Sequence, residues 1–363
     1  MNGILCLEDG RVFHGRIFSD PKLSIGEICF NMSMSGYQEI ITDPSYAGQI
    51  VVMSYPIIGN YGTHQNDAES RQPFLDGFVV REYCRNPGNQ RMTMTLHDFL
   101  KKNLVTAIEG IDTRALVRHI REKGEMRSAI APLPVDKQDL LGRIKNHPKL
   151  DGQDLASTVT TQSVYSMGNH QKIRIVVYDF GVKSNILRLI SQKAMVTVVP
   201  SYTTPDQVLR FDPDGIVLSN GPGDPAAVNY AIRNVKGLIG KRPILGICLG
   251  HQILGLVLGA KTFRLKFGHH GGNHPVRELE TGRVTITVQN HCFAVDTRMI
   301  EKCGAVVTHI NLNDQTLEGF CHPNLKIFSY QFHPEGAPGP MDAQDLIGKF
   351  IDTCQKDKIS KKS

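Results

Sequence analysis

The sequence has no tryptophan, and it lacks the patterns typical of membrane, secreted and nucleic-acid-binding proteins. No apolar run approaches the roughly 18 residues that a membrane-spanning helix needs. Residues 1–5 show no charged stretch followed by an apolar one, so we expect no secretory signal peptide. Basic residues form no stripe with interleaved aromatics, and the net charge of +6 is modest for 363 residues. We therefore expect a protein that binds neither membrane nor nucleic acid.

Two further absences concern cysteine pairs and phosphate loops. The eight cysteines include no C-x-x-C pair, which argues against a disulfide framework or a zinc site and favours a reducing compartment. We therefore expect a cytoplasmic location. The chain also contains no G-x-x-x-x-G-K-[ST] motif, so we expect no nucleotide bound through such a loop.

The length and the composition, 40% hydrophobic and 21% charged, indicate a globular chain with two domains. The composition becomes polar after residue 136 and stays so to about residue 171, which places the domain junction there. We predict an N-terminal domain at 1–150, a linker at 151–171 and a C-terminal domain at 172–363.

The first domain shows strands and turns with a few helices, which is typical of a mixed α+β fold. Apolar segments at 4–7 and 12–18 flank an Asp-Gly turn and predict a hairpin. A helical pattern covers 113–123, with Asp112 as its N-cap and Gly124 as its stop.

The second domain alternates strands with helices, and its strands are nearly all apolar. Such strands are typical of a parallel sheet that helices cover on both faces. The expected strands lie at 173–178, 196–199 and 215–219, and the expected helices at 184–192 and 205–209. We therefore predict an α/β fold with a mostly parallel C-terminal sheet, preceded by the smaller mixed α+β domain.

Cys248 lies where an apolar strand gives way to a helical pattern. Gly246 and Gly250 flank it in the G-x-Nuc-x-G spacing of a nucleophile elbow, in which small residues let the chain turn sharply. The helix that follows directs its free N–H groups and positive dipole end toward the sulfur, and Leu249 N–H becomes a candidate oxyanion donor. A buried structural cysteine is the alternative, and the elbow spacing alone leaves the two about equal.

A cysteine nucleophile needs a base, and the base needs an orienting acceptor. His333 follows the apparent last strand, and Glu335 two positions later projects to the same side. The two can pair, so the sequence predicts a Cys248-His333-Glu335 triad. The loop 220–225 also follows a strand and can bring its glycine N–H groups to the same sheet edge, although such Pro/Gly segments are more often plain turns.

Three segments, 246–252, 219–225 and 332–335, resemble the signatures of class I glutamine amidotransferases. Five more segments resemble the small subunit of carbamoyl phosphate synthetases, namely 31–46, 55–62, 110–114, 268–275 and 289–291. Together they span nearly the whole chain in the family's order.

The resemblance implies that Cys248 attacks the glutamine amide, that His333 serves as the acid and base, and that ammonia passes to a large subunit which uses ATP, Mg²⁺ and bicarbonate to make carbamoyl phosphate. It implies no cofactor in this chain, and a role in arginine synthesis, pyrimidine synthesis or both. By the same resemblance, the glutamine-binding residues are Ser45, Gly221, Gly223, Leu249, Gln252, Asn290, Cys292 and Phe293.

One position departs from the family pattern, because Cys292 stands where the family usually has glycine. If that glycine acts through its backbone, cysteine preserves the contact. If it supplies a positive φ or space, the side chain costs about 1 kcal/mol or more.

His269, His270 and His274 lie in a glycine-rich stretch that we expect to be a loop, and with His291 they form a local enrichment of histidine. Their spacing matches no helix-based ligand pair, so we expect no metal. Two other functions stay open: a different cysteine hydrolase on the same architecture, such as a peptidase, and a non-catalytic binding subunit whose pocket Cys292 has spoiled.

Overall fold

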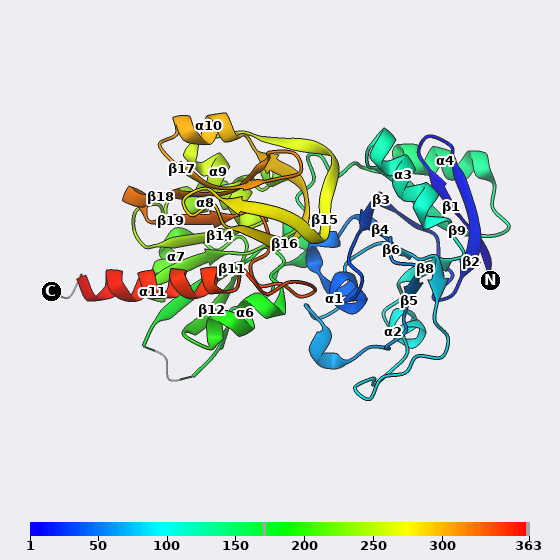
Figure 1. The fold of residues 1–363 in the computed structure, drawn as a ribbon, viewed down its shortest axis with the longest axis horizontal. Helices are drawn as coiled ribbons and strands as arrows, with labels where there is room; N and C mark the ends of the chain where they lie inside the picture. The colour runs from blue at the N-terminus through cyan, green and yellow to red at the C-terminus, as the bar shows by residue number, and fades with distance from the viewer. Residues whose placement is uncertain (170–171, 361–363) are drawn as a thin grey trace. The chain divides into compact units, whose positions relative to one another are not determined.

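The computed structural model describes residues 1–169 and 172–360, and the chain forms two compact units (Figure 1). Of the described residues, the first unit contains 1–153 and 266–271, and the second contains 154–169, 172–265 and 272–360. The segment expected to be a linker carries helix α5 (Ala156–Val159) and strand β10 (Tyr165–Met167), and its residues 170–171 lie outside the described part. The predicted boundaries stay a prediction.

The first unit is built on a closed barrel. Its strands follow the order β1 (Asn2–Leu7), β2 (Val12–Ile17), β8 (Thr106–Glu109), β6 (Gly77–Val79), β4 (Gln49–Met53), β3 (Ser24–Asn31) and β9 (Met126–Pro132). Antiparallel pairing of β1 with β2 confirms the predicted hairpin. Leu5, Ile28 and Ile130 belong to one buried apolar cluster of this unit, so alternate residues of the strands supply its core.

Helices and short strands complete the first unit. They are α1 (Tyr37–Thr42), α2 (Leu96–Lys102), α3 (Thr113–Lys123), α4 (Lys137–Asn146), the 3-10 turns η1 (Pro44–Tyr46) and η2 (Gln65–Asp67), and the pair β5 (Ile57–Ile58) and β7 (Glu82–Tyr83). The prediction for α3 is confirmed at both ends. Asp112 accepts a hydrogen bond from Ala115 N–H at 2.9 Å, and Gly124 takes φ 96° just after the helix.

The second unit contains a 10-stranded sheet. Its order is β10, β12 (Met195–Pro200), β11 (Arg174–Asp179), β13 (Gly215–Leu218), β14 (Ile244–Ile247), β19 (Ile327–Tyr330), β18 (Leu317–His322), β17 (Val306–Asn311), β15 (Thr262–Glu278) and β16 (Val284–Val295). The five central strands, β12, β11, β13, β14 and β19, pair with one another in parallel. Strand β10 pairs antiparallel with β12, and β18, β17 and β15 continue the sheet beyond β19 in antiparallel pairs. The expected parallel sheet is therefore the centre of a mixed sheet.

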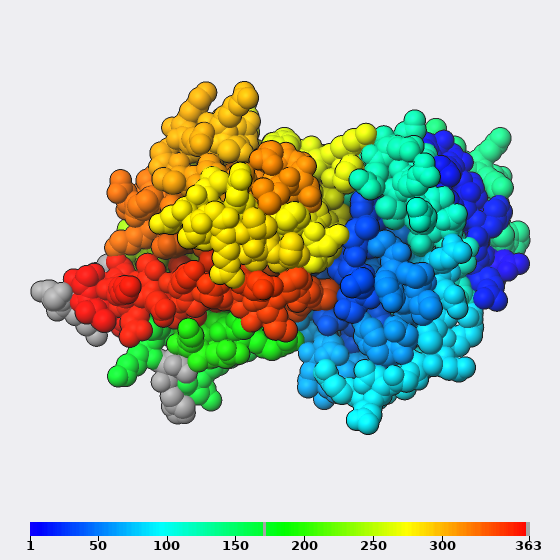
Figure 2. Space-filling view, in the orientation of Figure 1, coloured from blue at the N-terminus to red at the C-terminus, as the bar shows by residue number. Residues whose placement is uncertain are grey.

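Helices cover both faces of this parallel centre. On one face, the helices α6 (Ser184–Ser191) and α11 (Asp345–Ser360) share a buried cluster with Ile175 and Val177 of β11. On the other, α7 (Pro205–Arg210), α8 (Asn229–Lys236) and α9 (Leu249–Leu258) share a cluster with Val176 and Tyr178. Figure 2 shows the outer side of α11, in red, at the surface of this unit. Helix α10 (Thr297–Lys302) and the 3-10 turns η3 (Pro225–Ala227) and η4 (Pro323–Leu325) lie in the connections.

The glycine-rich stretch expected to be a loop is part of a strand. His269, His270 and His274 all lie within β15, which is 17 residues long. Glycine and histidine have weak strand propensity, and the strand forms because neighbouring strands satisfy its backbone. Across residues 1–169 and 172–360, none of the helices combines the length and apolar character that crossing a bilayer requires.

Candidate active site

Cys248 occupies a strained turn between β14 and α9. The strand ends one residue before it and the helix begins one residue after it, and its own φ of 53° and ψ of −104° are unusual for a residue with a side chain. Cys248 N–H donates to Tyr330 O at 2.9 Å, on the neighbouring strand β19. The sulfur therefore lies at the carboxyl edge of the sheet, where the first turn of α9 stabilises negative charge.

The two glycines that flank Cys248 are required for space. A Cβ on Gly250 would lie 2.2 Å from Leu218 O, and one on Gly246 would lie 2.6 Å from Leu254 Cδ1. Neither glycine has a positive φ. The elbow spacing in the sequence thus corresponds to the close approach of α9 to strands β13 and β14.

His333 and Glu335 follow β19 and form a buried pair. The Nδ1 of His333 and the Oε1 of Glu335 are 2.7 Å apart, and both side chains are almost completely buried. A carboxylate accepts, so the imidazole carries a proton on Nδ1, and Nε2 is the ring nitrogen that does not contact Glu335. The Nε2 has no hydrogen-bond partner, and the Cys248 thiol donates instead to Asn290 O at 3.4 Å.

Lys183, which the sequence reasoning missed, is the third member of this buried group. Its Nζ donates to Glu335 Oε1 at 2.9 Å and to Gly336 O at 2.7 Å, with 2% of its side chain exposed. One carboxylate oxygen thus receives both the ammonium and the imidazole. The only signal in the sequence is a lysine shortly after the end of a buried strand, in a loop at the carboxyl edge of the sheet.

Charges at the site shift two pKa values in opposite directions. Burial lowers the pKa of His333, but the negative charges of Glu335 and Cys248 outweigh it and the pKa is raised. Burial raises the pKa of Glu335, but the Lys183 ammonium and the imidazole outweigh it and hold that pKa well below its usual range. The negative charges of Glu335 and Cys248 therefore favour the imidazolium form of His333.

Most of the expected glutamine-binding residues surround this edge. A Cβ on Gly221 would lie 2.8 Å from Leu249 Cδ2, so these two residues are neighbours. The Gln252 amide donates to Phe293 O at 2.8 Å, and Asn290 O accepts from the Cys248 thiol. Gly223 lies in the loop after β13 with φ 90°.

Cys292 lies inside β16, and it is not among the described non-glycine residues with positive φ. A glycine is therefore not needed there for backbone conformation. Space is the property that the side chain affects, because Cys292 as a whole is only 8% exposed.

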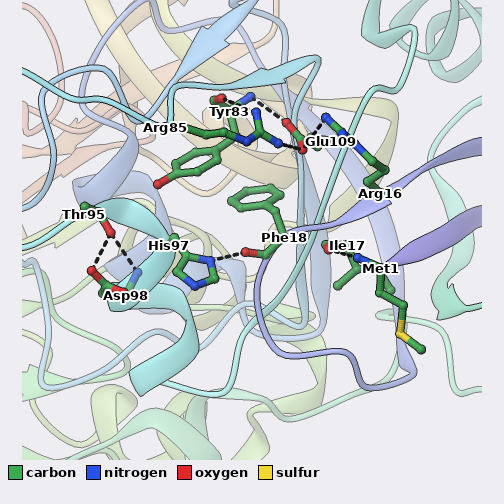
Figure 3. Close-up of a pocket in the computed structure, with 10 residues that line it drawn as sticks. All are labelled: Met1, Arg16, Ile17, Phe18, Tyr83, Arg85, Thr95, His97, Asp98 and Glu109. Atoms are coloured by element: carbon green, nitrogen blue, oxygen red, sulfur yellow. Dashed lines mark hydrogen bonds and ion pairs between the residues drawn. The ribbon is translucent and has the colours of Figure 1, made fainter.

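Ser45 belongs to the first unit, where it lies in η1 and its N–H donates to Asp43 Oδ1 at 2.9 Å. Its expected contact with glutamine stays a prediction. The first unit also has a cavity of about 520 Å³ (Figure 3). Arg16 and Arg85 both pair there with Glu109, and no residue expected to act on glutamine lines it.

Comparisons with known proteins match both parts of the chain. Residues 5–130 match the carbamoyl-phosphate synthase small chain, CPSase domain, and residues 176–353 match the class I glutamine amidotransferase family. A carbamoyl phosphate synthase small chain from Syntrophotalea carbinolica is 49% identical, and the match covers 99% of this chain and 100% of that one. The protein of the same name from Aquifex aeolicus is 47% identical over 97% of this chain and 98% of its own. A chloroplastic small chain from Oryza sativa is 44% identical over 98% of this chain and 82% of its own.

Proposed function

Because this chain belongs to the carbamoyl phosphate synthase small-chain family, we propose that it hydrolyses glutamine and delivers the ammonia to a large synthetase chain. The large chain would use ATP, Mg²⁺ and bicarbonate to make carbamoyl phosphate for arginine or pyrimidine synthesis, and this chain would carry no cofactor or metal of its own. A cytoplasmic location is part of the proposal. The observation that carries it is the buried group of Cys248, His333 and Glu335 at one sheet edge.

The reaction begins with the Cys248 thiolate, which attacks the carbon of the glutamine side-chain amide. The carbonyl oxygen takes the negative charge, and the N–H groups of Leu249 and Gly221 stabilise it. Leu249 is the first residue of α9, so the helix's own ladder of hydrogen bonds leaves its N–H free for this role.

His333 then gives a proton to the amide nitrogen, the C–N bond breaks, and ammonia leaves a glutamyl thioester on Cys248. His333, now neutral, takes a proton from water as the water attacks the thioester carbon. The C–S bond breaks, glutamate leaves and the thiolate returns. In both steps Glu335 accepts a hydrogen bond from His333 Nδ1 and so keeps the ring oriented, and the Lys183 ammonium donates to the same carboxylate.

The proposal is tested by Cys248→Ser in the complex with the large chain. Glutamine-dependent synthesis should vanish while ammonia-dependent synthesis persists, because only the first uses the thiolate. Cys303→Ser, on a partly exposed cysteine, is the matched control and should retain both activities.

A glutamine-like diazo-ketone adds a second test, because it should label the wild-type chain at Cys248. Absence of labelling at saturating reagent would support a non-catalytic subunit. Peptide cleavage without glutaminase activity would support the other cysteine hydrolase.

A further inference from the structure

Hydrogen bonds join five buried polar side chains of β16, β17 and β18 into one network, which includes the expected glutamine-binding strand. Thr287, Gln289 and His291 alternate along β16, and Asn311 and Glu318 come from β17 and β18. Glu318 and Asn311 are fully buried, Gln289 is 1% exposed and Thr287 is 2% exposed. The proposed reaction gives Thr287, Gln289, His291, Asn311 and Glu318 no role. Burying so many polar groups lowers the stability of the fold unless each of them is hydrogen-bonded.

The orientation of Asn311 fixes the state of Glu318. The Oδ1 of Asn311 accepts from Asn313 N–H at 2.9 Å, so the other end of the amide is its NH₂. That NH₂ donates to Glu318 Oε1 at 2.8 Å, and the Gln289 amide donates to Glu318 Oε2 at 2.8 Å. Both oxygens of Glu318 act as acceptors, as they do in an ionised carboxylate.

Two neighbours fix the orientation of Gln289 in turn. One hydrogen of its NH₂ faces Glu318, and the other faces Thr287 Oγ1 at 3.2 Å. The hydroxyl of Thr287 is already used as a donor to His274 O at 3.0 Å, so it can only accept from Gln289. Rotating the amide by half a turn would place its oxygen against a carboxylate and a hydroxyl oxygen. The Oε1 of Gln289 must therefore face His291.

His291 then has an acceptor at each ring nitrogen. Its Nε2 lies 2.9 Å from Gln289 Oε1, and its Nδ1 lies 2.7 Å from the carbonyl oxygen of Phe293. A neutral imidazole carries one N–H and would leave one of these two contacts between a pair of acceptors. Only the imidazolium satisfies both. A Glu318 oxygen and a nitrogen of the buried His269 both lie within 4.8 Å of a His291 nitrogen, and the Glu318 carboxylate is the member of this group that balances the charge.

We infer that His291 is held as an imidazolium, and that Gln289 and Glu318 are the positioning residues that keep it so. The charged Nδ1–H donates a strong hydrogen bond to Phe293 O, which also accepts from the Gln252 amide at 2.8 Å. The segment 290–293 is thereby fixed where the proposed reaction needs it, with Asn290 O against the Cys248 thiol. The effect on glutamine binding rests on the proposed glutaminase function. The charge of His291 is independent of that function.

Nitrogen-15 NMR of the histidine-labelled full chain at neutral pH tests the charge directly. His291 is assigned from the signal that His291→Asn removes. Both of its ring nitrogens should show the chemical shifts of an imidazolium, at a pH where an unperturbed histidine is mostly neutral. One protonated and one bare nitrogen would overturn the inference.

Glu318→Gln removes the countercharge while preserving shape, and should leave His291 neutral. The KM for glutamine should rise about tenfold or more, the loss expected for a charged hydrogen bond, while kcat changes little. Glu280→Gln makes the same change at an exposed position and should leave KM unchanged.

A charge swap guards against a variant that merely misfolds. In the double variant Gln289→Glu with Glu318→Gln, the carboxylate moves next to His291 and the imidazolium should return, together with the wild-type KM. A double variant no better than Glu318→Gln alone, or a Glu318→Gln variant in which His291 stays charged, would contradict the inference. Loss of Cys248 labelling in the wild type would instead refute the proposed function and leave the charge of His291 to be decided by its spectrum.

Discussion

Lys183 offers the sharpest test of the buried group beside Cys248. Lys183→Met removes the ammonium but keeps an unbranched side chain of similar length. Glu335 would then remain as a carboxylate with 0% exposure, sharing its Oε1 with His333 alone. Breaking a buried ion pair on one side costs about 3–5 kcal/mol, because the remaining charge is left without its partner.

Two measurable effects follow from the structure. The free energy of unfolding should fall by roughly 3–5 kcal/mol, which lowers Tm by about 10 °C in a unit of this size. The ammonium also lowers the pKa of His333, so its removal should raise that pKa further. An imidazolium that holds its proton more tightly is a weaker acid toward the departing ammonia. Each unit of pKa corresponds to about 1.4 kcal/mol, so kcat should fall by up to about tenfold for each unit by which the pKa rises.

Thermal unfolding and steady-state glutaminase assays measure the two effects separately. Lys193→Met is the matched control, because Lys193 is exposed near the end of α6, and it should behave as wild type. Adding Glu335→Leu to Lys183→Met removes the stranded carboxylate and should recover much of the lost stability without activity. A single variant with wild-type Tm and kcat would refute the role assigned to this ion pair.

Two other substitutions test the elbow and the first unit. Gly250→Ala would place its Cβ 2.2 Å from Leu218 O, so α9 would have to shift, and both glutaminase activity and Tm should fall. Gly142→Ala is the control: its Cβ would meet nothing within 4 Å, and activity should be unchanged. Burial raises the pKa of Asp76 from 3.8 to about 7, so the folded state binds a proton that the unfolded state releases, and stability declines as pH rises from about 4 to about 7. Asp76→Asn should flatten that decline and stabilise the protein at pH 8 by about 1–3 kcal/mol in urea unfolding, and a decline that persists unchanged would contradict this account.

The sequence predicted correctly those helices and strands whose position depends on a few neighbouring residues. Helix α3 begins after Asp112 and ends before Gly124 because a side-chain cap and a glycine with positive φ act within a few residues. Strands β11 and β13 are apolar on both sides because both of their faces are buried, so their sequence identifies them without knowledge of their neighbours.

The antiparallel half of the large sheet was missed for the opposite reason. The histidines and glycines of β15 follow no strand pattern, and the strand exists because others supply its hydrogen bonds. Lys183 and Glu318 were missed because an isolated charged residue in a sequence is most often exposed. Their burial depends on partners more than a hundred positions away for Lys183, and on neighbouring strands for Glu318.

The position of the nucleophile and the base depends on one strand pairing that no local pattern reveals. Strand β19 follows β14 by about eighty residues, yet it pairs directly with β14 in parallel, with Ile247 opposite Tyr330. Because parallel strands end at the same edge, Cys248 and the turn that carries His333 must leave the sheet together, and the bond from Cys248 N–H to Tyr330 O locks the register at its last residue. A slip of one residue would displace the imidazole by roughly 3.3 Å along the strand and turn every following side chain to the opposite face. The imidazole would then leave the sheet on the side away from the sulfur, so the register of β14 on β19 is as necessary to the proposed chemistry as the two side chains themselves.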